Sequence, residues 1–487
     1  TCLVYLIIFS IYCIYKNKNF KFLEYNPKKV EILCILLIIF IIQYIFATLT
    51  YAYNGWDCGG VVSSAFAALQ GENFNALYYS QYPNNIGILL LIKYVLVIAR
   101  LFTDMTVVSS GFFSAIVFNI MMVDIAALFT FLTIKKVLGN KSSYLSLIFI
   151  VPLIIFSPYI IITYTDTITM AFPIILLYLY IIIKELPRKS IRKYLLILLE
   201  GLLLAVGVTL KPTVIIISIA IIIIEILNIK IISIKKNILK NFMYLIIISI
   251  LFITGFSLSY ISYSKLKEKN LGSLISQEEY NNNSVSFTHF FMMGMQERKN
   301  DTQEEGKNQI LYGAYNGTDV ANTVAIKGYK EKQEYNLQII KERLNNFGVL
   351  GYIKFLYNKA NWILSDGTFF YGQEGTWKIG DYYNQSKIAR IAQQFIDANS
   401  NIYKNITSNI MQISWILITI GLVFSINKEE NKYINIGKLS IIGIVLFILM
   451  FEGRSRYLIN YIPIFVFIGI YGLRNSLKKL LLTLKHK

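Results

Sequence analysis

The sequence predicts an all-α polytopic membrane protein. Of its 487 residues, 55% are hydrophobic and only 15% are charged, which is more apolar surface than a soluble core would enclose. The apolar residues come in blocks of roughly 20, the length of a helix that crosses a bilayer. Short connections rich in Lys and Asn separate these blocks. Together these observations exclude an ordinary soluble domain with one hydrophobic core.

The net charge of +19 follows from membrane topology. The basic residues gather between apolar blocks, as they do in cytoplasmic loops under the positive-inside rule. We therefore expect membrane lipids around the chain and no nucleic acid partner. The four cysteines and two histidines are too scattered for a disulfide framework or a Cys/His metal cage. The abundance of Ile, Lys and Asn indicates a bacterial protein, and hence a multi-pass protein of the bacterial plasma membrane.

About eleven apolar blocks are long enough to cross the membrane. They lie at 2–15, 31–51, 110–134, 144–163, 167–183, 194–210, 212–228, 241–262, 407–426, 437–451 and 457–473. With the basic connections inside, the loops at 52–109, 164–166, 264–406 and 452–456 face outside. We expect an N-terminal transmembrane module at 1–263 that includes outer loop 52–109, then an extracellular loop domain at 264–406, then C-terminal transmembrane helices and a cytoplasmic tail at 407–487.

One apolar segment, Asn84 to Arg100, is not predicted to cross. Counting it as a span would put Lys135 and Lys136 outside and reverse every later loop. Lys93 also lies at its centre, where a charge costs about 2.5 to 3.5 kcal/mol on insertion scales. We expect a helix that lies along the outer interface or enters the membrane partway.

Both outer loops are predicted to be mainly helical. In the first, Val61, Val62, Ala65, Phe66 and Leu69 share one helical face, and Gly71 is suited to end that helix. Asp57 is therefore followed by juxtamembrane helices. In the second, Lys327 to Asn346 is typical of a soluble helix ending at Gly348, and Val349 to Leu364 of an amphipathic helix on the membrane surface.

An ordered set of short stretches resembles the GT-C superfamily of polyprenyl-phosphate-dependent glycosyltransferases. The set comprises "WDCGG" after an early span, "YYSQYPNNIG", "TYTDT", "LKPT" and "FEGRSRYLINYIPIF". It is most similar to bacterial relatives of protein O-mannosyltransferases, and "HFFMMGM" and "NWILSDGTFF" resemble a Gram-positive branch. The resemblance implies a GT-C-like bundle and an inverting membrane glycosyltransferase that takes sugar from a polyprenyl phosphate outside the cell. The acceptor would be a cell-envelope glycan, a glycolipid or a protein, and the resemblance leaves room for a divalent metal.

Three aspartates are candidate acids. Transfer to a hydroxyl needs a carboxylate to accept its proton, and the resemblance makes Asp57, at the water-membrane boundary, that base. The alternative is that Asp57 caps the helix that starts near Gly59. Asp166, in "TYTDT", is the second predicted catalytic acid, with a capping role as its alternative. Asp124 falls inside the 110–134 span and must face protein or water, either as the partner of a buried cation or as a catalytic group.

The departing phosphate needs cations, and Arg454 and Arg456 are the best candidates because a guanidinium offers two parallel donors to phosphate oxygens. The alternative is interfacial snorkelling with a salt bridge to Glu452. Lys211 and Lys93 are further candidates for the same phosphate, and Lys93 also fits a snorkelling lysine.

Weaker candidates lie in both outer loops. Tyr82, Asn84 and Asn85 suit sugar hydroxyls, although Tyr-Pro-Asn is also ordinary turn chemistry. His289 suits acid-base work near neutral pH, or is a packed loop histidine.

Two rival functions are a glycan polymerase or ligase and a non-enzymatic lipid or polysaccharide transporter. The first predicts arginines mainly within the large loop and gives Asp57 no role. The second predicts paired halves or interrupted helices, and the sequence shows no duplication. Nucleotide-sugar donors are disfavoured because the chain has no GxxxxGK[ST] motif and no Gly-rich dinucleotide turn.

Overall fold

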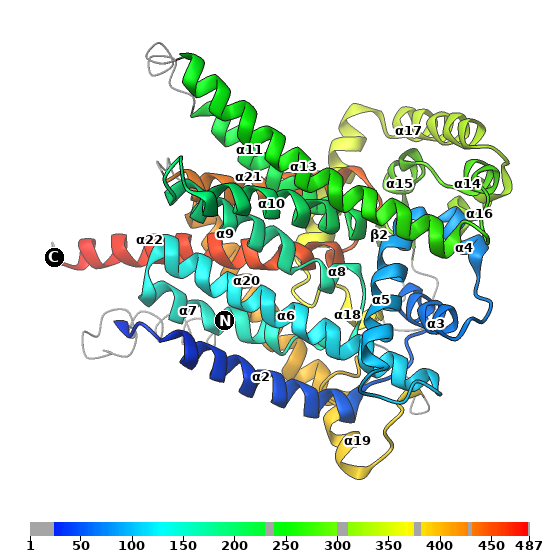
Figure 1. Cartoon of the computed structure of the whole chain (residues 1–487), viewed down its shortest axis with the longest axis horizontal. Helices are drawn as coiled ribbons and strands as arrows, with labels where there is room; N and C mark the ends of the chain where they lie inside the picture. The colour runs from blue at the N-terminus through cyan, green and yellow to red at the C-terminus, as the bar shows by residue number, and fades with distance from the viewer. Residues whose placement is uncertain (1–23, 229–237, 300–309, 375–380, 427–430, 486–487) are drawn as a thin grey trace.

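The chain folds into a bundle of long helices with smaller helices gathered at one end (Figure 1). The computed structural model describes residues 24–228, 238–299, 310–374, 381–426 and 431–485. The predicted span at 2–15 lies outside these ranges. In the described part the only strands are a short antiparallel pair, β1 (Glu297–Lys299) and β2 (Ile310–Tyr312). The all-α prediction is confirmed.

Nine helical segments within the described residues are long and apolar enough to cross a membrane. They are Lys29–Thr50, Val108–Leu138, Asn140–Ile161, Thr165–Glu185, Ile191–Leu210, Met243–Leu271, Tyr403–Phe424, Lys432–Met450 and Ser455–Ser476. The predicted span at 212–228 corresponds to a shorter apolar helix, Pro212–Leu227. Each predicted span from residue 31 onward therefore has a helical counterpart.

The helices of these spans bear the following labels. They are α2 (Lys29–Thr50), α6 (Val108–Leu138), α7 (Asn140–Ile150), α8 (Thr165–Ile168), α9 (Ala171–Glu185), α10 (Ile191–Leu210), α11 (Ile215–Leu227), α13 (Ile238–Leu271), α20 (Ser408–Phe424), α21 (Lys432–Met450) and α22 (Ile462–Lys485). A π-helical turn (Val151–Ile155) and a 3-10 turn (Pro158–Ile161) follow α7, and the 3-10 segment η8 (Ser455–Tyr461) precedes α22.

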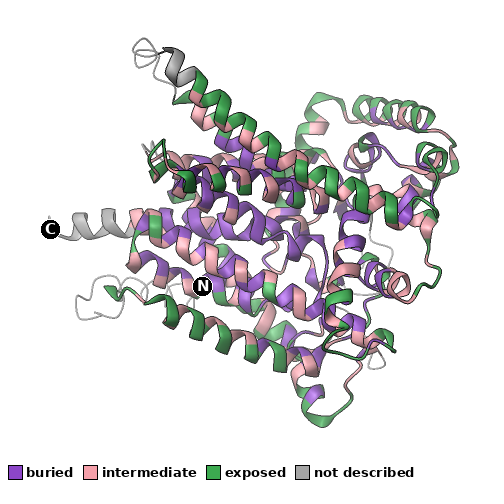
Figure 2. Ribbon diagram, in the orientation of Figure 1, coloured by how far each residue is buried: buried purple, intermediate pink, exposed green. Residues whose placement is uncertain are grey.

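The bundle has a buried centre and an apolar outside. In the most apolar 18-residue stretch of the span Ser455–Ser476, 89% of the residues are buried, whereas only 6% are buried in that of Met243–Leu271 and 11% in that of Lys29–Thr50 (Figure 2). The outer faces of α2 and α13 carry exposed Ile and Leu side chains, such as Ile38, Ile41, Ile250 and Ile253. An exposed apolar face of this length suits lipid rather than water. The central helix α22 therefore organises the bundle, while α2 and α13 lie at its edges.

The basic ends of several helices meet at one end of the bundle. Arg474 on α22 donates from NH1 to the Leu138 carbonyl at the end of α6, at 2.7 Å. Lys136 forms an ion pair with Glu185 at the end of α9, at 2.8 Å, and Lys432 at the start of α21 pairs with Glu225 of α11 at 3.2 Å. The smaller helices lie at the opposite end (Figure 1). Basic residues at these helix ends are what the positive-inside rule predicts for a cytoplasmic end, and this orientation stays a prediction.

Residues 52–109, predicted to form the first outer loop, contain the predicted helices. Helix α3 (Asp57–Gln70) buries Val61, Val62, Ala65 and Phe66, and ends at Gly71 in the left-handed conformation, with φ 75°. After α4 (Ala76–Gln81) comes α5 (Ile86–Ala99) with 14 residues. Such a helix is about 21 Å long, against about 30 Å of hydrocarbon core. The apolar helix Pro212–Leu227 is similarly short, so the interfacial position of α5 stays a prediction.

The second outer loop packs over the same end of the bundle. Its helices are α14 (Gln277–Asn283), α15 (Phe287–Met293), α16 (Gly317–Ala325), α17 (Tyr329–Leu364), α18 (Tyr371–Glu374) and α19 (Lys387–Gln393). Helix α17 bends at Gly348, whose φ is 58° and ψ 176°, so the two predicted helices are present with the predicted break. The buried Lys359 of α17 donates to the carbonyls of Gly294 at 2.9 Å and Phe451 at 2.7 Å. These bonds fasten the loop to the segment that leads into η8.

Candidate functional site

The sharp turn that begins α8 buries Asp166. Thr167 closes this turn by donating from its hydroxyl to the Ile162 carbonyl at 2.9 Å. The Asp166 carboxylate contacts Lys211 Nζ, and its Oδ2 lies 3.3 Å from Arg456 Nε. Its side chain is 2% exposed. Asp166 is therefore neutralised by two cations from distant parts of the chain.

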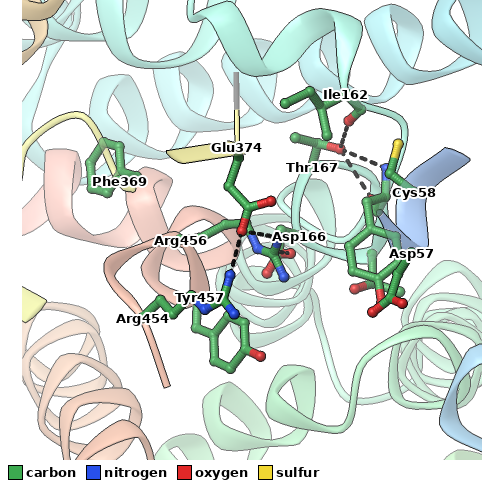
Figure 3. A network of polar contacts seen from close by, with 12 residues as sticks. Asp57, Cys58, Ile162, Asp166, Thr167, Phe369, Glu374, Arg454, Arg456 and Tyr457 are labelled. Atoms are coloured by element: carbon green, nitrogen blue, oxygen red, sulfur yellow. Dashed lines mark hydrogen bonds and ion pairs between the residues drawn. The ribbon is translucent and has the colours of Figure 1, made fainter. Parts of the chain in front are cut away.

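A second carboxylate, Glu374 at the end of α18, joins the two arginines. Its Oε1 accepts from Arg454 NH1 at 2.8 Å and from Arg456 NH1 at 2.7 Å. Figure 3 shows the carboxylate pointing at both guanidinium groups. The Arg456 side chain is 7% exposed and the Arg454 side chain 21%. Arg454 is therefore the more accessible of the two cations.

Lys211 lies in the connection that follows α10, where Pro212 prevents the helix from continuing. Its ammonium group lies 4.8 Å from the centre of the Tyr457 ring. Burial lowers the pKa of Lys211, and the adjacent Asp166 carboxylate opposes this shift. The Tyr457 hydroxyl in turn donates to Glu452 Oε2 at 2.7 Å, which connects Glu452 to the same cluster. Glu452 is thus hydrogen-bonded to a tyrosine, and not paired with Arg454 or Arg456 as the alternative interpretation of the sequence predicted.

Asp57 lies beside this cluster but remains exposed. It is the first residue of α3, whose N-cap is Trp56 rather than Asp57. The Tyr164 hydroxyl lies 3.4 Å from Asp57 Oδ2 and 3.2 Å from Asn85 Oδ1. Asn85 Nδ2 donates to the Tyr78 hydroxyl at 2.5 Å. The pKa of Tyr78 is raised by burial and by the negative charge of Asp57.

Aromatic rings connect Asp57 to the buried cations. The Arg456 guanidinium lies 4.4 Å from the centre of the Trp56 ring and 5.5 Å from that of Tyr164. Within the described residues Asp57 forms no ion pair, whereas Asp166 and Glu374 do. The site thus contains one exposed carboxylate and two neutralised ones, separated by aromatic side chains.

Other predicted residues lie elsewhere or at the margin. Lys93 donates to Asn270 Oδ1 at 2.6 Å, and the Asn84 amide lies 3.4 Å from Asn85 Oδ1. Tyr82 follows α4, and burial raises its pKa to about 12, with smaller contributions from Tyr315 and Asp57.

His289 and Asp124 do not reach the ionic cluster. His289 is fully buried, and its Nδ1 lies 3.0 Å from the Thr323 hydroxyl. Burial lowers the pKa of His289 to about 4, so the ring is neutral at pH 7, which favours the packed-loop interpretation. Asp124 is buried in α6, and among the described residues no ion pair joins it to the predicted cation.

The sequence interpretation missed Glu374 and Asp366. Asp366 accepts hydrogen bonds from the backbone N–H of Thr368 at 2.9 Å and of Phe370 at 2.6 Å, and from the Ser455 hydroxyl at 2.6 Å. It thereby holds a turn in which Phe369 and Phe370 have φ of 55° and 67°. Asp and Gly are typical turn residues, so the Asp-Gly-Thr sequence could have predicted this turn.

The described residues contain no group of three or more His, Cys, Asp and Glu side chains that could hold a metal ion. Asp166 and Glu374 already have cationic partners, so the divalent metal that the resemblance leaves open has no preformed ligand set in this part of the chain.

Comparison with known proteins identifies a family. The chain belongs to the family described as conserved hypothetical integral membrane protein. The match covers residues 1–477. No curated protein and no solved structure matches the chain. Membership establishes an integral membrane protein, in agreement with the nine apolar helices of the described residues.

Proposed function

We propose that this integral membrane protein is a glycosyltransferase that moves a sugar from a polyprenyl phosphate to an acceptor hydroxyl on the outer face of the membrane. The observation that carries this proposal is an exposed carboxylate, Asp57, beside a cluster containing Arg454, Arg456 and Lys211. The reaction needs a proton acceptor and positive charge for the leaving phosphate, and both are present here.

In this mechanism Asp57 accepts the proton of the acceptor hydroxyl, whose oxygen attacks the anomeric carbon of the sugar. The bond from that carbon to the phosphate oxygen breaks, and the phosphate leaves with the bonding electrons and with inversion. Arg454 is the first side chain to contact the phosphate, because it is the more exposed of the two arginines. The mechanism assigns no step to a metal.

The buried members of the cluster have a supporting role. Arg456 and Lys211 are paired with Asp166, so they contribute positive potential near the phosphate, and NH1 of Arg456 is held by Glu374. Asp166 consequently acts by positioning these cations, and we no longer assign it a direct contact with substrate. The outer placement of the site is supported by its position at the end of the bundle opposite the basic helix ends.

The test is product formation by purified protein in lipid nanodiscs. The protein is given a panel of polyprenyl-phosphate sugars and a crude envelope extract, and release of polyprenyl phosphate is measured. Asp57→Asn is expected to lower the rate by about 10² to 10⁴, the usual contribution of a general base. Glu72→Gln is the matched control, since Glu72 is also exposed and follows the same helix.

The outcomes separate the candidate functions. Loss of release in a folded Asp57→Asn variant, with Glu72→Gln active, supports the proposal. Equal release from wild type and Asp57→Asn removes Asp57 from the mechanism. No release with any donor overturns the glycosyltransferase assignment and favours the polymerase or transporter alternatives.

A further inference from the structure

Glu374 occupies the position in which two arginines would bind an anion. A single carboxylate oxygen, Oε1, accepts from NH1 of both Arg454 and Arg456, at 2.8 and 2.7 Å. A phosphate oxygen bound between two guanidinium groups would make the same pair of charge-assisted contacts. The Glu374 side chain is 5% exposed, so it fills this position almost completely.

The charges in the cluster make phosphate binding depend on Glu374. Arg454, Arg456 and Lys211 are offset by carboxylates that contact them or lie beside them. A phosphate monoester carries an additional negative charge, and a like charge at contact distance disfavours binding. Phosphate and the Glu374 carboxylate therefore compete for the same donors.

The segment that carries Glu374 is built to hold the carboxylate there. Helix α18 follows directly on the turn in which Phe369 and Phe370 have positive φ. Asp366 holds this turn and also accepts from Ser455, which lies between the two arginines. The Phe370 ring lies 5.0 Å from the Arg454 guanidinium carbon. The same turn thus contacts Arg454 and the neighbouring Ser455.

We propose that Glu374 is an internal competitor that occupies the two-arginine position when no phosphate is bound, and that the phosphate group of a polyprenyl phosphate displaces it. This inference rests on the proposed function, because it names how the donor phosphate gains access to that site. Glu374 then lowers the affinity of the site for phosphate, and so favours dissociation of the lipid phosphate after transfer.

The test measures binding, without any sugar transfer. Farnesyl phosphate is titrated into the nanodisc-embedded protein, and the Kd is obtained from intrinsic tryptophan fluorescence, which includes Trp56 against Arg456. Farnesol and inorganic phosphate are titrated separately, to distinguish binding of the isoprenoid chain and of free phosphate from binding of the lipid phosphate. Glu374→Gln is expected to lower the Kd for farnesyl phosphate about tenfold or more, equivalent to at least about 1.4 kcal/mol.

Two further variants make the result specific. Glu452→Gln also removes a negative charge near the cluster but leaves the arginine contacts of Glu374 intact, so its Kd is expected to change less than threefold. Glu374→Ala repeats the removal of the carboxylate in case Glu374→Gln folds poorly, as judged by thermal unfolding.

An unchanged or higher Kd in both folded Glu374 variants overturns the inference, as does an equal gain in Glu452→Gln. Failure of all variants to bind farnesyl phosphate overturns it as well. These results are distinct from failure of the proposed function, which is measured as absence of transfer. Tighter binding in Glu374→Gln without transfer activity would support the anion site and reject the glycosyltransferase.

Discussion

The buried pair of Asp166 and Lys211 provides a quantitative test of how the cluster is held together. Their side chains are 2% and 11% exposed, and Arg456 at 7% is the second partner of Asp166. Removing one member of a buried pair leaves an uncompensated charge and costs about 3 to 5 kcal/mol. We therefore expect Asp166→Asn and Lys211→Met each to lower the free energy of unfolding by about this amount.

The double variant should be less destabilised than the sum of the two single variants. With both charges absent, neither Asp166 nor Lys211 leaves the other unpaired, and Arg456 keeps Glu374 as its partner, so we expect a coupling free energy of about 2 to 3 kcal/mol. The measurement is a double-mutant cycle by reversible denaturant unfolding in detergent micelles. The matched control is the pair Lys136 and Glu185 at the opposite end of the bundle, at 2.8 Å with side chains 39% and 47% exposed.

An exposed pair of this kind contributes only about 0 to 1 kcal/mol. If the Asp166–Lys211 coupling were no larger than that of Lys136–Glu185, the buried pair would not hold the cluster together. The positioning role of Asp166 would then be wrong.

Three further predictions concern the outer region. Burial lowers the pKa of His289 from 6.5 to about 4. Between pH 6.5 and pH 4 this imidazole is therefore protonated in the unfolded state but neutral in the folded state. Stability should fall by about 3 kcal/mol as the pH is lowered through this window, and His289→Asn should reduce the slope in unfolding measured from pH 7 to 4. Asp366→Ala removes the acceptor for the Phe370 amide, so hydrogen exchange of that amide should accelerate about tenfold or more. Unchanged exchange would show that the turn is stable without the Asp366 side chain. Lys359→Met leaves buried carbonyls without their donor and should cost about 2 to 5 kcal/mol in denaturant unfolding; a neutral result would remove Lys359 as the link between α17 and Phe451.

The spans were predictable because their signal is local. A run of apolar residues specifies a crossing helix wherever the rest of the chain goes, and a glycine with positive φ marks a helix end or a break. Gly71 and Gly348 were identified in this way, and both have the expected backbone conformation. The predicted interfacial position of α5 rests on one charge, Lys93, and on the arrangement of the loops around it.

The site was only partly predictable because burial is a property of tertiary packing. Arg454 and Arg456 are two residues apart in the sequence, yet one is 21% exposed and the other 7%. Asp166 and Lys211 were both identified as candidates, but their pairing was not visible. Glu374 lies in a loop without a regular pattern, and only the fold brings it to the arginines.

Asp57 and Asp166 show why sequence context alone does not assign roles to acids. Each lies in the first turn of a helix at the same end of the bundle, directly after or close to an aromatic residue. Asp166 turns into the core and is neutralised by Lys211 and Arg456, whereas Asp57 stays at the surface. Trp56 and Tyr164 contact Arg456 with their ring faces, and the Tyr164 hydroxyl reaches Asp57 at 3.4 Å.

This aromatic layer has a chemical consequence. A carboxylate paired directly with Arg456 would be held in its charged form and would be a poorer acceptor for a substrate proton. With Trp56 and Tyr164 against the guanidinium, the positive charge stays close to the site where a phosphate would leave, while Asp57 keeps an exposed face for the hydroxyl. For the proposed transfer between a lipid phosphate and a hydroxyl, this separation leaves the base available to accept a proton and the cations available to the phosphate.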